Sequence, residues 1–321
     1  MNIKYDFRNE REKNFPLMLN LEITNICNYQ CIHCPYPSIS QRKDYTPKFM
    51  SWEIFKKIAD QTANYPETIF RFVCDGEPMM HPDFLRMVEY VKNLKISPVC
   101  FTTNGYFLTP EVSRKIVEFG CDLIEISLDA FSEYSYNKIR RGGNYHKVID
   151  NLNYLIQSKN ELSAKSSKIM VSIIDQPLVK NEITTFKNFW QDKVDYVITR
   201  VLTSAGGFIK ESIRDNKTDV EIRWPCPLLW RRLFINVDGW AEYCVDDWLD
   251  QSILGDVNKE SIASIWGGQK YRDLRKNHIN NNFSYNEKCA QCQDWRARTW
   301  ENDYFHAIER IFNLNFKNEN Y

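Results

Sequence analysis

The sequence has no excess of charge of either sign and no long apolar run. Lys and Arg together number 42, as do Asp and Glu, and no basic tract stands out, so we expect no nucleic-acid partner and no anionic membrane surface. The longest apolar runs, such as LFINV at 233–237, have the length of a strand and not of a membrane-spanning helix. The charged N-terminus lacks a signal-peptide core. We therefore expect a cytoplasmic chain whose thiols stay reduced.

Cysteine is also scarce, with 10 residues in 321, yet Cys27, Cys31 and Cys34 lie within eight positions. A disulfide pairs two cysteines, and a structural zinc site takes four ligands, usually as two close pairs. Three thiolates at spacings of four and three suit a metal site that keeps one coordination position open. In a reducing compartment, the cysteines point to metal binding or catalysis and not to disulfides.

Residues 17–201 alternate between apolar, β-branched runs and amphipathic helical patterns. This alternation predicts βα units and a parallel sheet, which right-handed crossovers curl into a full or partial barrel. Polar or glycine-containing loops follow nearly every predicted strand, and the three-cysteine loop follows the first. These loops would share one rim, where barrel active sites form. The predicted strands lie at 17–24, 68–73, 98–104, 122–129, 168–175 and 195–201.

The pattern changes after residue 206. Residues 208–321 hold seven of the nine tryptophans, which more often build the core of a small domain than a sugar-stacking surface. Within RRLFINVDGWAEYC, Asp238-Gly239 predicts the turn of a hairpin. We predict an N-terminal lead at 1–16, a barrel at 17–206 and a small C-terminal α+β domain at 207–321.

Several motifs together resemble the radical S-adenosylmethionine (SAM) superfamily. They are the CxxxCxxC loop, CDGEP at 74–78, TTNG at 102–105, ISLDA at 126–130 and YNKIRRGGNYHKVIDNL at 136–152. The resemblance covers residues 17 to about 300 and implies a partial (β/α)6 TIM-like barrel. It also implies a [4Fe–4S] cluster that is bound by three cysteines, so that the fourth iron of the cluster chelates SAM. One electron from this cluster then yields a 5′-deoxyadenosyl radical.

The resemblance assigns roles at the cluster. Cys27, Cys31 and Cys34 would ligate it, and His33, unless it is an ordinary loop histidine, would lie near the adenine. Gly76 would allow close backbone approach, and Glu77 would accept from the SAM ammonium. Asp75 stands where the family has a glycine, which leaves the local backbone geometry open.

Further SAM contacts are expected at the strand ends, from Asn104, Ser127, Asp129 and Arg140, with Arg141 equally placed for the SAM carboxylate. Structural alternatives exist for three of them. Asn104 begins a common turn dipeptide, and Ser127 and Asp129 could cap the next helix.

Four further cysteines, Cys226, Cys244, Cys289 and Cys292, follow the barrel. Their layout resembles the twitch domain, a shortened SPASM domain, in which four cysteines enclose one auxiliary [4Fe–4S] cluster. A structural zinc site is the alternative. The implied cofactors are therefore SAM and two [4Fe–4S] clusters, one that binds SAM and one auxiliary.

The cysteine layout is similar to that of SAM-dependent dehydrogenases that oxidise an alcohol of an aminocyclitol or sugar. We predict a radical SAM oxidoreductase that acts on a hydroxyl-bearing small molecule, with the auxiliary cluster as electron acceptor and a flavodoxin or ferredoxin as reductant. Where the aminocyclitol enzyme has an arginine before a Gly-Gly pair, this chain has Ala205. Arg200 is the candidate to supply that charge.

A peptide maturase or epimerase, acting on a ribosomally made precursor or a sugar, is the alternative function. Epimerisation needs a thiol hydrogen donor, for which Cys74, Cys100 and Cys121 are the barrel candidates, unless they are small buried hydrophobes. A redox or metal-binding scaffold with a degenerate SAM site is a third hypothesis.

Overall fold

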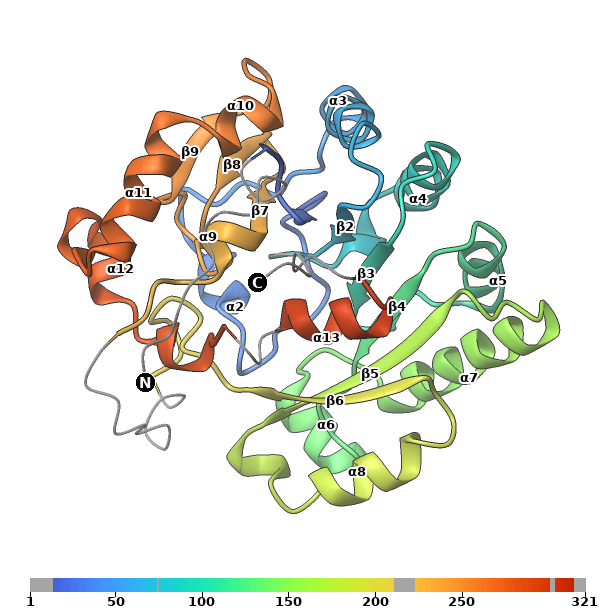
Figure 1. The fold of residues 1–321 in the computed structure, drawn as a ribbon. Coiled ribbons are helices and arrows are strands. Elements are labelled where there is room, and N and C mark those ends of the chain that lie inside the picture. Colours follow the sequence, from blue (N-terminus) through green and yellow to red (C-terminus); the bar gives the residue numbers. More distant parts are fainter. Residues whose placement is uncertain (1–13, 74, 211–222, 301–303, 315–321) are drawn as a thin grey trace.

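The computed structural model describes residues 14–73, 75–210, 223–300 and 304–314. Six parallel strands pair in sequence order and curl into the partial (β/α)6 barrel that the sequence predicts (Figure 1). Among all the residues that the structure describes, no helix has the length and apolar character needed to cross a membrane. The strands are β1 (Met18–Leu21), β2 (Ile69–Phe72), β3 (Val99–Thr103), β4 (Leu123–Ser127), β5 (Lys168–Asp175) and β6 (Tyr196–Val201).

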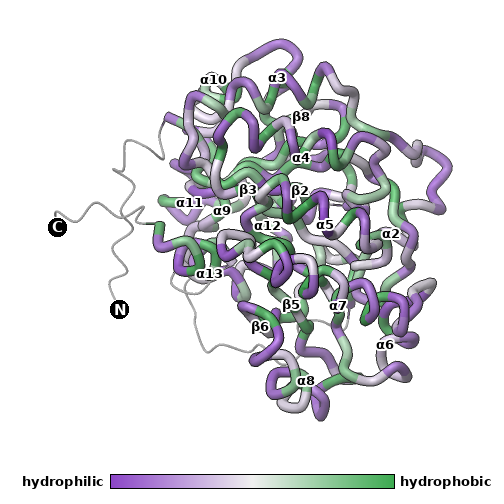
Figure 2. The backbone as a smooth tube through the Cα atoms, turned by 90° about the vertical axis from the view of Figure 1, so that its right-hand side faces the viewer, coloured by the Kyte–Doolittle hydropathy of each residue, from purple (hydrophilic) through white to green (hydrophobic). Residues whose placement is uncertain are grey.

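Amphipathic helices cover the outside of the barrel because their apolar faces pack on the strands. In α3 the side chain of Ser51 caps the first turn, and Phe55 and Ile58 are buried. Hydrophobic residues are frequent around β2 and β3, and hydrophilic residues predominate in the outer loops (Figure 2). The helices are α2 (Tyr36–Ile39), α3 (Trp52–Thr62), α4 (Phe84–Asn93), α5 (Pro110–Glu118), α6 (Glu133–Ile139), α7 (Tyr145–Glu161) and α8 (Ile183–Trp190), with 3₁₀ turns η1 (Pro78–Met80) and η2 (Pro177–Val179).

The C-terminal part extends the barrel sheet. Strand β7 (Arg232–Ile235) pairs in parallel with β1, from Met18 opposite Arg232 to Leu21 opposite Ile235. Strand β8 (Trp240–Glu242) then pairs antiparallel with β7, and β9 (Ile253–Asp256) with β8. Gly239, at φ +85°, makes the turn, so the predicted hairpin is confirmed. The sequence did not predict that the hairpin continues the barrel sheet, and the boundary near residue 206 stays a prediction.

Short helices surround this hairpin, and the last helix, α13 (Tyr304–Ile311), returns to the barrel (Figure 1). Phe305 and Ile308 of α13 are buried against Met18, Ile69 and Leu123, which lie at the N-terminal ends of their strands. Helix α13 therefore closes the floor of the barrel. The remaining elements are α9 (Leu228–Arg231), α10 (Ile262–Trp266), α11 (Gln269–Ile279), η3 (Phe283–Tyr285), α12 (Glu287–Gln291) and η4 (Asp294–Ala297).

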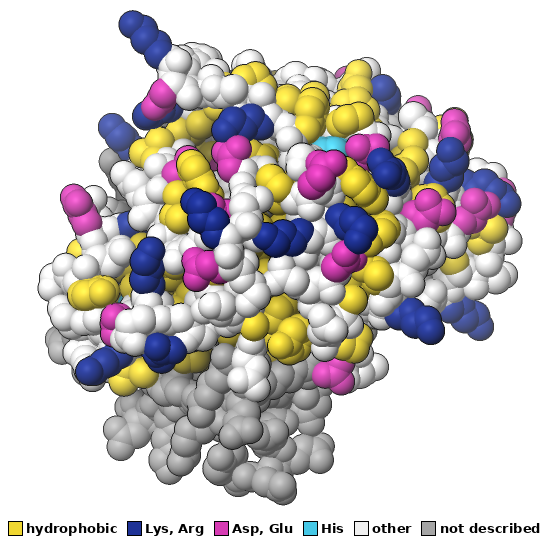
Figure 3. Space-filling model, turned by 90° about the horizontal axis from the view of Figure 1, so that it is seen from above, with side chains coloured by type: hydrophobic (Ala, Val, Ile, Leu, Met, Phe, Trp, Pro, Cys, Tyr) yellow, Lys and Arg dark blue, Asp and Glu magenta, His cyan; other side chains and the backbone are white. Residues whose placement is uncertain are grey.

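The molecular surface seen from above mixes side chains of both charges. Lys and Arg alternate with Asp and Glu across this face, and hydrophobic side chains lie between them (Figure 3). A face with such interspersed charges has no single-sign field of the kind that steers a nucleic acid.

Candidate functional site

The loop after β1, residues 22–35, carries the three cysteines and is called the cysteine loop below. Its backbone is tied to the end of α6, because Gln30 N donates to Arg141 O at 2.8 Å and Ile32 N to Ile139 O at 3.0 Å. Cys27, Cys31 and Cys34 lie close enough to interact electrostatically. Burial raises the pKa of the Cys27 thiol to about 12, so the thiolate forms there only when a bound metal displaces the proton.

Gly76 lies against the cysteine loop. A Cβ at this position would come within 2.2 Å of Thr24 O and 2.7 Å of Ile26 O, so only glycine fits. The neighbouring Glu77 N donates to Ile26 O at 2.8 Å. The close backbone approach expected at Gly76 is therefore an approach to the cysteine loop, which packs directly against this glycine. It also persists although Asp75 replaces the family's first glycine.

Glu77 is 3% exposed and is therefore not an ordinary acid of a surface loop. Its carboxylate accepts from Thr103 Oγ1 at 2.7 Å and from Asn104 N at 2.7 Å. Burial raises its pKa to about 6 despite these hydrogen bonds. Asn104 also donates from Nδ2 to Asn28 Oδ1 at 2.8 Å and accepts from Tyr106 N at 3.0 Å. Both predicted SAM contacts thus connect β2 and β3 to the cysteine loop, and the turn geometry expected at Asn104 is present.

Asp129 and Arg140 form a buried pair beside the cysteine loop. Asp129, at φ +58°, accepts from Ile174 N at 2.9 Å and from the Arg140 guanidinium. Burial acts to raise the pKa of Asp129, but the charge and the hydrogen bond of Arg140 outweigh it and lower that pKa. Arg140 is buried whereas Arg141 is exposed, so Arg140 is the one that faces the barrel interior.

His33 lies against the same pair. Its Nε2 is 3.4 Å from Asp129 Oδ2, and burial lowers its pKa to about 4. The ring is therefore neutral at pH 7, and its role beside the adenine stays a prediction. Helix α6 is capped by Ser132, so Ser127 and Asp129 do not serve as that cap.

A cavity of about 600 Å³ fills the barrel interior and is called the barrel cavity below. It brings together five of the predicted residues, which come from four separate segments of the chain. Its size lies within the range of small-molecule and cofactor sites. The predicted residues in its wall are His33, Ser127, Asp129, Arg140 and Arg200.

The floor of the barrel cavity is a buried charge network that the sequence analysis missed. Glu125 on β4 pairs with Arg71 at 3.2 Å and with Arg200, and it accepts from Tyr304 Oη at 2.7 Å. Burial acts to raise the pKa of Glu125, but Arg200 and Arg71 together lower it to about 2. The guanidinium groups of Arg71 and Arg200 lie 4.1 and 4.5 Å from the ring centre of Tyr304. Arg200 is thus held in place by Glu125 and α13.

All four later cysteines line one pocket of about 100 Å³, called the cysteine pocket below. Cys289 and Cys292 lie at the start and end of one helical turn, and Cys226 and Cys244 come from the segments before α9 and after β8. Burial raises the pKa of Cys289 to about 12, which again favours thiolates only with metal bound. No three His, Cys, Asp or Glu side chains of the described residues converge on a position for one metal ion.

The cysteine pocket and the barrel cavity share a wall. Leu228, Asp246 and Arg298 line both. Asp246 accepts from the Arg298 guanidinium, and both side chains are largely buried. The two cavities are therefore separated by single side chains.

The loop after β6 is tied to this wall by a carboxylate. Asp294 accepts from Ser204 N at 2.6 Å, from Ser204 Oγ at 2.8 Å and from Gly206 N at 3.3 Å. A Cβ on Gly206 would lie 2.6 Å from Asp246 O. Ala205 is buried in this loop, so the loop serves as packing and presents no charge where the aminocyclitol enzyme is expected to have one.

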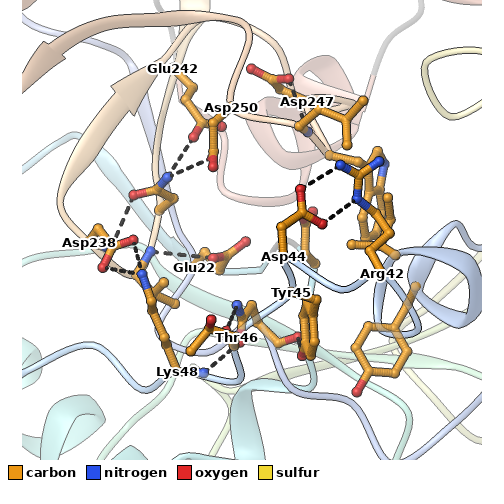
Figure 4. Close-up of a pocket in the computed structure, with 18 of the residues that line it drawn as sticks. Glu22, Arg42, Asp44, Tyr45, Thr46, Lys48, Asp238, Glu242, Asp247 and Asp250 are labelled. Atoms are coloured by element: carbon orange, nitrogen blue, oxygen red, sulfur yellow. Dashed lines mark hydrogen bonds and ion pairs between the residues drawn. The ribbon is translucent and has the colours of Figure 1, made fainter.

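A second large cavity, of about 370 Å³, lies between the cysteine loop and the β7–β8 hairpin and is rich in carboxylates (Figure 4). Burial raises the pKa of Glu22 to about 7, and burial with neighbouring carboxylates raises that of Glu242 to about 10. Asp75 lines the same cavity, and burial raises its pKa well above the usual range. The residue that departs from the family motif thus belongs to this acidic cavity.

Cys100 and Cys121 fall outside both cysteine sites. Cys100 is buried in the floor cluster with Phe305 and Ile308, and Cys121 is fully buried in the main core. Both match the small-hydrophobe alternative, and Cys74 lies outside the described residues. Trp224 packs on Trp295 with ring centres 4.8 Å apart, as the core interpretation of the tryptophans predicts.

Comparison with known proteins places these features in a family. The model of the radical SAM superfamily matches residues 21–172, and that of the SPASM iron–sulfur cluster-binding domain matches 226–293. The first range contains the cysteine loop, and the second contains all four cysteines of the cysteine pocket.

Relatives agree with both domains. The chain is 30% identical over 318 residues to the tungsten-containing aldehyde ferredoxin oxidoreductase cofactor-modifying protein of Pyrococcus furiosus, which covers 85% of this chain and 86% of that protein. It is 29% identical over 175 residues to the GTP 3′,8-cyclase of Lactiplantibacillus plantarum and spans about half, 50%, of that relative's length.

Solved structures share the fold. BtrN in complex with AdoMet and 2-DOIA superposes with a TM-score of 0.58 at 17% identity, covering 86% of this chain and 92% of BtrN. Streptococcus suis SuiB bound to its precursor peptide SuiA gives a TM-score of 0.68 at 14% identity, covering 94% and 75%. The chain belongs to the radical SAM superfamily, whose cofactors are SAM and [4Fe–4S] clusters, and it carries a C-terminal SPASM iron–sulfur cluster-binding domain.

Proposed function

We propose that this protein is a SAM-dependent dehydrogenase that oxidises a hydroxyl-bearing small molecule, such as a sugar or aminocyclitol, to a carbonyl compound. The observation that carries the proposal is the wall of Leu228, Asp246 and Arg298 between the barrel cavity and the cysteine pocket. A substrate bound in the barrel cavity would be separated from the cysteine pocket by these shared side chains. Such proximity is what transfer of an electron from substrate to a second cluster requires.

The proposed metal ligands are Cys27, Cys31 and Cys34 for the SAM-binding cluster, and Cys226, Cys244, Cys289 and Cys292 for the auxiliary cluster. When bound, SAM and its cluster supply a 5′-deoxyadenosyl radical that abstracts a hydrogen atom, and the auxiliary cluster accepts the electron that the substrate radical releases. The chain's own task is to place the substrate carbon and to exclude water.

Positioning of SAM is assigned to the residues around the cysteine loop. Glu77 and Asn104 fix the loop and present polar atoms beside Cys27, while Asp129, Arg140 and His33 line the adjoining part of the barrel cavity. Arg140 meets the SAM carboxylate in this proposal because it is buried and faces the cavity, whereas Arg141 is exposed.

Arg200 is assigned to the substrate. It reaches the barrel cavity from β6 and is fixed by Glu125 and by the ring of Tyr304. A guanidinium held in this way donates to hydroxyl or carboxylate oxygens in a fixed orientation, which selects one carbon for hydrogen abstraction.

The barrel cavity supports a small substrate. Its volume of about 600 Å³ must hold SAM as well, and α13 supplies part of its wall through Tyr304 and Ala307. The Pyrococcus furiosus relative, which aligns with 85% of this chain, is named for modifying a cofactor and not a peptide. The reductant that we propose is a flavodoxin or ferredoxin.

A peptide maturase is the second candidate. It is favoured by the fold shared with SuiB, whose structure holds a precursor peptide, and by 31% identity over 140 residues to the mycofactocin maturase MftC of Mycobacterium tuberculosis. These matches cover 75% of the SuiB chain and 34% of MftC, so each leaves part of the other protein uncovered.

The first test measures iron and zinc after anaerobic reconstitution of the wild type and of Cys289→Ala/Cys292→Ala. We expect about eight irons per chain in the wild type and about four in the variant, as two four-iron clusters require. About four irons in both proteins, with zinc lost from the variant, would refute the auxiliary cluster and with it the dehydrogenase proposal.

The second test follows turnover in deuterated buffer with a panel of sugars and aminocyclitols. Dehydrogenation should give one carbonyl product per 5′-deoxyadenosine formed, with no deuterium at the attacked carbon. Solvent deuterium at that carbon would show that hydrogen is returned, and would favour epimerisation over oxidation.

A further inference from the structure

His278 lies in the wall of the cysteine pocket together with the four cysteines. The histidine belongs to α11 and is 1% exposed. Its ring packs edge-on against Phe283, with ring centres 5.1 Å apart. A polar ring in such a position must satisfy its nitrogen atoms inside the protein or lose free energy.

The backbone determines which nitrogen of His278 carries the proton. Cys226 N donates to Nδ1 at 3.2 Å, so Nδ1 acts as an acceptor and bears no hydrogen. A ring with an accepting nitrogen is neutral and carries its single proton on Nε2. That N–H is buried and has no hydrogen-bond partner among the described residues. An unpaired buried donor is costly, and here it lies at a pocket built from thiols.

We propose that His278 donates a hydrogen bond from Nε2 to a sulfur atom of the auxiliary cluster, and that this bond makes the cluster a better electron acceptor. Hydrogen bonds to the sulfurs of iron–sulfur clusters tune their reduction potential. The bond becomes stronger when the cluster gains an electron, because the negative charge on the sulfurs increases. The inference rests on the proposed function, since it requires the cluster that the four cysteines would hold.

The cationic side chains in the pocket make contacts with the protein, although Nε of Arg223 is, like Nε2 of His278, buried without a hydrogen-bond partner among the described residues. Arg223 Nη1 donates to Cys289 O at 2.6 Å, Lys288 pairs with Asp247 at 3.2 Å, and Arg298 pairs with Asp246. These cations provide a positive environment. His278 adds a directed donor, because within the described part of the chain its ring is hydrogen-bonded through Nδ1 and Nε2 stays unpaired.

The test compares His278→Phe with His278→Gln in an EPR-monitored redox titration of the reconstituted protein without substrate. Phenylalanine keeps the ring but removes the donor, whereas glutamine places an amide N–H near the position of Nε2. We expect His278→Phe to lower the equilibrium constant for reduction of the auxiliary cluster at least tenfold, equivalent to 59 mV for one electron. His278→Gln should keep most of the wild-type value.

Two controls belong to the same titration. The SAM-binding cluster is an internal reference whose potential should not move. His146→Gln changes a histidine whose side chain is 73% exposed and should leave both potentials unchanged. Pulsed EPR on the reduced auxiliary cluster should show a weak ¹⁴N coupling and an exchangeable proton that His278→Phe abolishes.

The outcomes separate this inference from the proposed function. About eight irons in every variant, with less than a twofold change in the equilibrium constant for His278→Phe, would overturn the role of His278 alone. A strong ¹⁴N coupling typical of an iron–nitrogen bond would make His278 a ligand and not a donor. About four irons in the wild type would refute the auxiliary cluster itself, and both proposals would fall.

Discussion

Replacement of Glu125 by glutamine tests whether the floor of the barrel cavity is held together by charge. Glu125 is fully buried between Arg71 and Arg200. Its pKa is lowered from the usual 4.5 to about 2, and each pKa unit corresponds to about 1.4 kcal/mol, so the ionised form contributes about 3 kcal/mol. Removal of one partner of a buried ion pair costs about 3–5 kcal/mol in other proteins. We therefore expect Glu125→Gln to lower the free energy of unfolding by about 3 kcal/mol at pH 7.

The sign of the pH dependence follows from the lowered pKa. Above pH 4.5 both folded and unfolded protein carry an ionised Glu125, and the full stabilisation is present. It is lost as the pH falls from 4.5 through about 2, because the unfolded chain takes up the proton first. Glu125→Gln should remove this part of the acid sensitivity.

Anaerobic urea titrations of the reconstituted protein, followed by far-UV circular dichroism, provide the assay. Tyr304→Phe removes one hydrogen bond to the same carboxylate and should cost about 1.5 kcal/mol. Glu125→Gln/Arg200→Met restores the net charge of the wild-type network and should recover part of the stability lost in the single variant. A loss below about 1 kcal/mol for Glu125→Gln would refute the reasoning.

Two further predictions concern the cysteine loop and the acidic cavity. Gly76→Ala should displace the cysteine loop, because the added Cβ would lie 2.2 Å from Thr24 O. The iron content after reconstitution should then fall from about eight to about four per chain. The control is Gly207→Ala, where a Cβ meets nothing within 4 Å; it should lower the free energy of unfolding by only about 1 kcal/mol, through its φ of +97°, and should keep its iron. Glu242→Gln should stabilise the protein by about 5 kcal/mol at pH 8, because the folded pKa of about 10 makes the wild type lose stability as the pH rises above 4.5. Thermal unfolding at pH 5 and pH 8 measures this, and an equal effect at both pH values would contradict it.

The sequence predicted the barrel well because its signals are local. Each strand is an apolar run, several helices have a capping residue such as Ser51 or Thr109, and the crossovers follow from chirality. The cysteine spacing likewise predicts its own loop. These features depend on neighbours along the chain and not on distant packing.

The parts that could not be predicted depend on contacts between distant residues. Glu125, Arg71 and Tyr304 each look ordinary in sequence, and only the closure of the barrel by α13 places them together. The same holds for Asp294, which binds a loop about ninety residues earlier in the chain. The charged residues inside the apolar strands IFRF and LIEIS are local signals that pointed to the network, because an unpaired charge is too costly to bury.

The pairing of β7 with β1 determines how the two cysteine sites are spaced. The cysteine loop begins where β1 ends, β7 ends a few residues before the turn that leads to Cys244, and Glu22 N donates to Ile235 O at 2.9 Å. A ladder of backbone hydrogen bonds therefore joins the start of the cysteine loop to the hairpin that leads to Cys244. In the proposed function the electron passes from the substrate to the auxiliary cluster. Because electron tunnelling rates depend steeply on distance, a spacing built into a sheet would hold that rate constant while the surface loops move and substrates exchange.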